Sequence, residues 1–134
     1  MTFPAQNNKK KLSFVLNNAR SICNKFDLVS NYLQSNNNVD MLFLTETWLQ
    51  SKDTDAMFCP PGFDVIRLDR VNRRGGVMLL HKNCLRVNHC NVSYPLDSNF
   101  EIICVDVHFS KFPFVFVVFT YRHLRHYRLK TLVK

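Results

Sequence analysis

The run from Val39 to Leu44 constrains the fold of this chain more than any other segment. Five of its six residues are apolar, and polar residues do not alternate with them as in a half-exposed strand. The run therefore predicts a strand that is buried on both faces. Glu46 follows at its carboxyl end, where ligands and metals bind in α/β folds. Most acids at strand ends are solvated or cap the next turn, so the case for Glu46 depends on its neighbours.

A second short strand is predicted upstream, within residues 11–21, and it ends in an amide, Asn18. Between the two strands, four apolar residues recur on one face of a predicted helix: Ile22, Phe26, Val29 and Leu33. The order strand, helix, strand predicts a right-handed βαβ unit, which brings Asn18 and Glu46 to the same edge of a sheet. An amide oxygen and a carboxylate suit a hard cation such as Mg²⁺.

The rest of the chain predicts a packed sheet. Four further strands are expected, at residues 63–68, 76–81, 100–109 and 112–119. The alternation in the third of these leaves Glu101 outside an apolar set formed by Ile103, Val105, Val107 and Phe109. Gly75 and Gly76 precede a strand, which predicts a hairpin bend. A turn that cradles phosphate is the alternative.

Several motifs in collinear order resemble one known family. They are Asn18-Ala19-Arg20-Ser21 with Asn24-Lys25-Phe26, Leu44-Thr45-Glu46-Thr47-Trp48-Leu49, Pro61-Gly62-Phe63, Arg67-Leu68-Asp69-Arg70 with Arg73-Arg74-Gly75-Gly76-Val77, and Phe119-Thr120-Tyr121-Arg122. Over residues 12–122 the chain resembles the endonuclease domain of non-LTR (LINE-type) retrotransposons, within the endonuclease/exonuclease/phosphatase superfamily. Phosphoinositide phosphatases and sphingomyelinases share that fold, but these strings point to the retroelement branch. The resemblance implies an α/β (α+β) fold, a two-sheet β-sandwich flanked by helices.

The resemblance also implies an activity and a set of site residues. The family consists of Mg²⁺- or Mn²⁺-dependent phosphodiesterases that nick target DNA for retrotransposition. Glu46 matches the metal-binding glutamate, Asn18 matches a catalytic asparagine near the metal, and Tyr121 matches the tyrosine that contacts the scissile phosphate. Five arginines are candidates for contact with DNA: Arg20, Arg70, Arg73, Arg74 and Arg122. For the three in the loop at residues 69–75, solvated surface is the alternative interpretation.

The remaining motifs of the family do not occur in these 134 residues. There is no Gly-Asp-Phe-Asn-like segment and no Ser-Asp-His triplet, which in the family activate the water and steady the phosphate. We therefore expect a sandwich truncated at the C-terminus and inactive alone, with the remainder of a retroelement polyprotein as a possible partner. An apolar sheet face and an unpaired edge are expected to be exposed, which favours aggregation. The alternative is a non-catalytic basic remnant that binds nucleic acid weakly or has no function.

Length and charge agree with a single DNA-binding domain. With 134 residues, of which 46% are apolar, we expect one domain at residues 12–122, a basic and flexible leader at 1–11 and a basic tail without defined structure at 123–134. A tail that grips phosphates is the alternative interpretation. The formal net charge of +8 suits a polyanion such as DNA.

The cysteines indicate a reducing compartment. There are five, an odd number, and no two of them form a Cys-x-x-Cys pair. This pattern predicts reduced thiols in a nuclear or cytoplasmic protein that is not secreted. No signal peptide and no membrane-spanning run is predicted, so a membrane is not expected as a partner.

Overall fold

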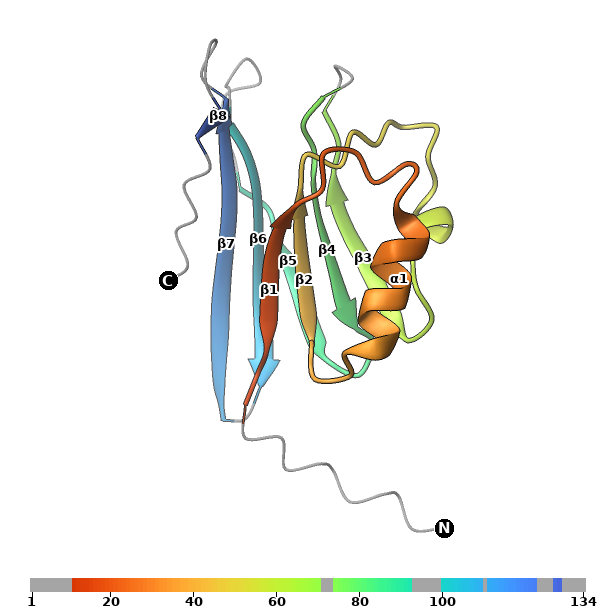
Figure 1. Ribbon diagram of the computed structural model, residues 1–134. Coiled ribbons are helices and arrows are strands. Elements are labelled where there is room, and N and C mark those ends of the chain that lie inside the picture. Colours follow the sequence, from red (N-terminus) through yellow and green to blue (C-terminus); the bar gives the residue numbers. More distant parts are fainter. Residues whose placement is uncertain (1–10, 71–73, 93–99, 110, 123–126, 129–134) are drawn as a thin grey trace.

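The computed structural model describes residues 11–70, 74–92, 100–109, 111–122 and 127–128. Within them the chain has a mixed α/β fold, in which two β-sheets pack face to face and a helix covers the other face of the first sheet (Figure 1). The elements in chain order are β1 (Phe14–Asn18), α1 (Phe26–Ser35), β2 (Met41–Thr45), the 3-10 helix η1 (Asp55–Phe58), β3 (Phe63–Leu68), β4 (Val77–Lys82), β5 (Arg86–Cys90), β6 (Phe100–Phe109), β7 (Phe112–Arg122) and β8 (Tyr127–Arg128).

The first sheet has the strand order β1-β2-β4-β3 and contains the expected βαβ unit. β1 and β2 are parallel, with Asn18 directly opposite Thr45, and α1 connects them. The predicted helical stretch began too early, because α1 starts only at Phe26. Ile22 lies in the preceding turn, where its N–H donates to Thr47 O at 3.0 Å, and its side chain is nevertheless fully buried.

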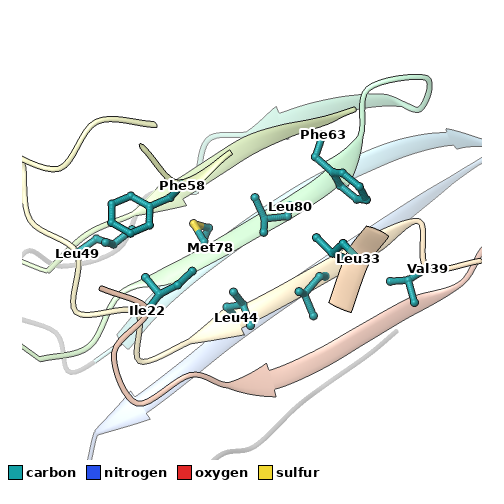
Figure 2. Close-up of a cluster of buried hydrophobic side chains, with 10 residues drawn as sticks. Ile22, Leu33, Val39, Leu44, Leu49, Phe58, Phe63, Met78 and Leu80 are labelled. Atoms are coloured by element: carbon teal, nitrogen blue, oxygen red, sulfur yellow. The ribbon is translucent and has the colours of Figure 1, made fainter. Parts of the chain in front are cut away.

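β2 and β4 form the centre of the first sheet and are buried on both faces, as the apolar run at Val39 predicted for β2. One face packs against α1 and the segment that leads through η1. Figure 2 shows the labelled members of this cluster gathered on that face. Its buried members are Ile22, Leu33, Val39, Leu42, Leu44, Leu49, Phe58, Phe63, Met78 and Leu80. A two-sided core of this kind fixes the register of β2, because a one-residue shift exchanges its two faces.

The other face of β2 and β4 packs against the second sheet. The core between the sheets contains Met41, Phe43, Val77, Leu79, Ile103, Val105, Val107, Phe116 and Val118. At the edge of this core, the ring of Phe14 on β1 makes edge-to-face contacts with Phe43 and Phe116, at centroid distances of 6.4 and 5.1 Å. These contacts join the edge strand of the first sheet to β7 of the second.

The second sheet has the order β5-β6-β7-β8, and all its neighbouring strands are antiparallel. The two long predicted strands are confirmed as β6 and β7, although β7 continues to Arg122. One strand was not predicted: β5 is short and mostly polar, and its pairing with β6 holds it in place. In the tail, where no structure was expected, Tyr127 and Arg128 pair with the end of β7.

The expectation of helices around the sandwich is met on one side only within the described residues. α1 covers the first sheet, whereas no described helix covers the outer face of the second sheet, which carries Ile102, Cys104, Val115 and Val117. The Val115 side chain on this face is 51% exposed. This face is therefore apolar and exposed at Val115, but it also carries the polar residues Asp106 and His108 of β6.

Candidate functional site

Asn18 and Glu46 come together at the edge where β1 and β2 end, which we call the carboxyl edge (the top of the sandwich in Figure 1). Asn18 lies beside Thr45, the residue that precedes Glu46. Beyond the strands the two chains stay in contact, since Ala19 N donates to Thr45 O and Ser21 N donates to Glu46 O, both at 2.8 Å. The prediction that these two strands end at one sheet edge is confirmed, with the backbones of Asn18 and Glu46 as neighbours.

Glu46 occupies an unusual backbone conformation, with φ of +56°. Left-handed backbone at a residue other than glycine is uncommon, and it is often found at functional sites. Its half-buried side chain accepts a hydrogen bond from the indole Nε1 of Trp48 at 2.8 Å, and Trp48 itself has φ of +57°. A carboxylate has four lone-pair sites, so this one bond leaves Glu46 able to accept a cation as well.

The loop after Asn18 is held by a lysine that the sequence analysis assigned to no site. Asn18 Oδ1 accepts the Arg20 N–H at 3.1 Å, which forms a turn closed by a side chain. Lys25 Nζ donates to Ala19 O at 2.8 Å and to Arg20 O at 3.0 Å. The Ala19 and Arg20 carbonyl groups therefore bind the Lys25 ammonium group, and the side chains of both Lys25 and Arg20 are exposed.

Gly75 and Gly76 pass close to two side chains at the carboxyl edge, and both have φ of +93°. Trp48 N donates to Gly75 O at 2.8 Å and Thr47 N donates to Gly76 O at 3.3 Å. A Cβ at Gly75 would lie 2.4 Å from Glu101 Oε1, and one at Gly76 would lie 2.4 Å from Thr47 Oγ1. The close approach of backbone to side chain explains why both positions are glycine.

Glu101 is a buried member of this site that the sequence analysis set apart from the apolar face of β6. The structure corrects that interpretation, since Glu101 lies on the same inward face as Ile103 and is 8% exposed. Its Oε2 accepts the Gly76 N–H at 2.8 Å, and its Oε1 lies 3.6 Å from Arg70 Nε. These partners compensate the burial of the charge. Because the Gly76 N–H donates to Glu101, this group is already used within the protein. That favours the hairpin bend over the turn that cradles phosphate.

The candidate arginines have different environments. Arg74 is exposed and its guanidinium lies 5.6 Å from the centroid of the Trp48 ring, while Arg70 is half-buried beside Glu101. Arg73 lies outside the described residues. Arg67, which belongs to the same motif as Arg70, donates to Gln50 O and Asp69 Oδ2, at 3.0 and 2.9 Å, and also to Asp53 O, and it pairs with Asp55 at 3.4 Å. Arg67 therefore anchors the segment before η1.

Tyr121 and Arg122 lie at the end of β7, which reaches the same carboxyl edge (Figure 1). In the register of β6 and β7, Tyr121 is opposite Phe100 and Thr120 is opposite Glu101. Because Glu101 binds Gly76, the backbone of Tyr121 belongs to the same end of the sandwich as the Gly75-Gly76 turn. The two sheets thus bring segments far apart in the sequence to one edge.

Within the described residues, no three His, Cys, Asp or Glu side chains are grouped so that they could hold a metal ion. Glu46 and Asn18 would supply two protein oxygens from neighbouring strand ends. Mg²⁺ is commonly bound by one or two carboxylates and completes its shell with water and substrate phosphate, so this donor set fits Mg²⁺ better than a metal that needs several protein ligands.

Comparison with models of known protein families and with curated proteins finds no match to this chain. Among the described residues, no helix is both long enough and apolar enough to cross a membrane.

Proposed function

We propose that this chain carries the metal-binding side of a Mg²⁺- or Mn²⁺-dependent DNA endonuclease site, in a domain of the LINE-type branch of the endonuclease/exonuclease/phosphatase superfamily. The observation that carries the proposal is the meeting of Asn18 and Glu46 at the ends of two adjacent parallel strands. The strand–helix–strand order and the packing of two sheets agree with the sandwich expected for that family. The collinear motifs over residues 12–122 support the same assignment.

Glu46 and Asn18 would hold the metal ion through their side-chain oxygens. When bound, the ion supplies charge neutralisation at a phosphodiester and a template for its oxygens. Arg74, held against the Trp48 ring at the same edge, is placed to contact the DNA backbone, where each phosphate contact adds to affinity in a salt-dependent way. Tyr121 is proposed to contact the scissile phosphate, as in the family.

The residues that activate the water in the family are not among these 134 residues. We therefore propose that hydrolysis needs groups from a further segment, for which the remainder of a retroelement polyprotein is the expected source. The chain alone would bind a divalent cation weakly and DNA through its basic edge. The chain by itself is expected to be inactive, because a bound metal ion without an oriented water leaves the attacking group unpositioned.

The test compares the chain with Glu46→Gln and with a matched control, Asp64→Asn, which changes an exposed acid on β3. Binding of Mn²⁺ is followed by electron paramagnetic resonance. We expect Glu46→Gln to weaken binding by about tenfold and the control to leave it unchanged. Equal Mn²⁺ binding by all three proteins would refute the metal site and favour the alternative, a basic remnant without catalytic function.

Nicking of supercoiled plasmid in Mg²⁺ tests the second part of the proposal. We expect no nicking by the chain, together with DNA binding that weakens in Arg74→Ala. The slope of log affinity against log salt should fall by about 0.9 in that variant. Nicking that Glu46→Gln abolishes would show that the chain cleaves DNA without further groups, against the proposed inactivity.

A further inference from the structure

Two cysteines face each other on the second sheet. Cys90 on β5 and Cys104 on β6 are direct partners in the antiparallel register, and the Cys90 thiol also lies 4.0 Å from Asn88 O. Cys104 alternates with Ile103 and Val105, which are fully buried between the sheets, so the two thiols lie on the outer face of the second sheet. Both side chains are half-buried, and both thiols are free.

Direct cross-strand partners have the spacing that a disulfide needs. Their Cα atoms lie about 4.5 or 5.5 Å apart, depending on whether the pair is hydrogen-bonded. Disulfides span Cα distances of about 4.4–6.8 Å, so either arrangement can be bridged. The Cβ atoms of cross-strand partners are usually about 1 Å farther apart than in a disulfide, so the bridge would contract the ladder slightly. Such a strained bond is easily reduced again.

The remaining cysteines do not share this geometry. Cys23, Cys59 and Cys84 lie outside the strands and have no cysteine opposite them in a sheet register. Cys59 donates its thiol hydrogen to Phe63 O, at a sulfur–oxygen distance of 2.8 Å. Cys23 and Cys84 are exposed, and neither is paired with another cysteine across a sheet. These differences make Cys90 and Cys104 a distinct pair whose chemistry can be separated from that of the other thiols.

We propose that Cys90 and Cys104 form a reversible dithiol–disulfide site that is oxidised by low-molecular-weight disulfides such as oxidised glutathione. In the first step a deprotonated protein thiol attacks one sulfur of the small disulfide, whose S–S bond breaks. One small thiolate leaves and takes up a proton, and a mixed disulfide remains on the protein. The second protein thiol then loses its proton and attacks the protein sulfur of that mixed disulfide, which releases the second small thiol. Two protein thiols are oxidised, and one small disulfide is reduced to two thiols.

The two sulfurs are not equivalent. Burial raises the pKa of the Cys104 thiol, and the hydrogen bond and charge of Cys90 and the charge of Asp106 raise it further. A thiol that stays protonated attacks slowly, because the thiolate is the nucleophile. Cys90 lies on β5, the edge strand of the second sheet, whereas Cys104 lies on β6 between two neighbouring strands. The geometry therefore assigns the first attack to Cys90 and the closing attack to its cross-strand partner Cys104.

Peptide mass mapping without reductant, after treatment of the full chain with oxidised glutathione, tests the site. We expect the wild type and the control Cys84→Ser to contain a Cys90–Cys104 link that dithiothreitol removes. Cys104→Ser should stop at a glutathione adduct on Cys90, and Cys90→Ser should react at Cys104 at least several-fold more slowly. Links between two chains, or adducts on Cys90 and Cys104 that never close to a link, would overturn the proposal.

A second measurement needs no oxidation. Dibromobimane becomes fluorescent only when it bridges two thiols, so it reports the pair in the reduced chain. The wild type and Cys84→Ser should become fluorescent, and both Cys90→Ser and Cys104→Ser should lose that fluorescence. Equal fluorescence in Cys90→Ser would show that other thiols form the bridge, and the assignment of this pair would be wrong.

Discussion

Replacing Gly76 with alanine tests how tightly the carboxyl edge is built. Gly76 has φ of +93°, and a Cβ there would lie 2.4 Å from Thr47 Oγ1, a buried atom with no hydrogen-bond partner among the described residues. Gly62 is the matched control, because it has φ of +83° but no atom within 4 Å of the Cβ that alanine would add. The two substitutions share the backbone strain, and only Gly76→Ala adds a collision, in a buried turn.

The magnitudes separate the two effects. An L-residue in left-handed backbone costs about 1–2 kcal/mol. Loss of chain freedom in the unfolded state returns about 0.4–1 kcal/mol of this. We therefore expect Gly62→Ala to lower the free energy of unfolding by about 1 kcal/mol. Gly76→Ala adds overpacking in a buried site, about 1–3 kcal/mol, for a total of about 2–4 kcal/mol.

Urea unfolding measures both variants, with fluorescence of Trp48, the single tryptophan, and circular dichroism as independent probes. A second substitution at Thr47 identifies the collision. Thr47→Ala removes Oγ1 and should recover about 1–2 kcal/mol in combination with Gly76→Ala, whereas Thr47→Val keeps a γ-carbon there and should recover nothing. If Gly76→Ala destabilises no more than Gly62→Ala, the close approach at this turn is not as described.

Three further outcomes are expected. Glu101→Gln removes the charge that binds Gly76 N and Arg70, so urea unfolding should show a loss of about 1–3 kcal/mol, and a loss below about 0.5 kcal/mol would contradict the burial argument. Burial raises the pKa of the Cys59 thiol above its ordinary value of 9.0, with Asp64 and Asp55 adding to the effect. Because the raised pKa belongs to the folded state, its stabilising contribution is complete below pH 9.0 and is lost as the pH rises through the raised value. Alkylation of Cys59 in the folded chain at pH 8 should therefore be slower than in urea, and equal rates would contradict this. Val115→Lys, at a 51% exposed position on the outer face of the second sheet, should reduce aggregation in light scattering and change stability by less than about 0.5 kcal/mol, and unchanged aggregation would mean that another surface drives it.

The central part of the fold was predictable because its signals are local. The apolar run before Glu46 has no polar position to turn toward water, so it predicts a strand covered on both faces, and β2 is covered in that way. The helical spacing up to Leu33 then makes the connection between β1 and β2 a helix, the usual crossover between parallel strands, and these strands are parallel. Because parallel strands end at the same edge, the neighbouring positions of Asn18 and Glu46 followed from the sequence.

The start of α1 and the polar strand β5 were not predictable, because their signals are not local. Ile22 fits the helical spacing, yet its N–H bonds to Thr47 O across the sheet edge, and a long-range partner decides where α1 begins. β5 has no alternation strong enough to identify it and depends on the neighbouring β6 for its hydrogen bonds. In both cases, the deciding group is far away in the sequence.

The sequence by itself determined the βαβ unit, the buried central strand and the edge at which Asn18 and Glu46 meet, because hydrophobic period and strand direction are properties of short segments. Only the tertiary structure decided that Glu101 turns inward to bind Gly76 and that Cys90 lies opposite Cys104. Both depend on how one strand is aligned against another. That alignment is set by packing between the two sheets, which no single segment contains.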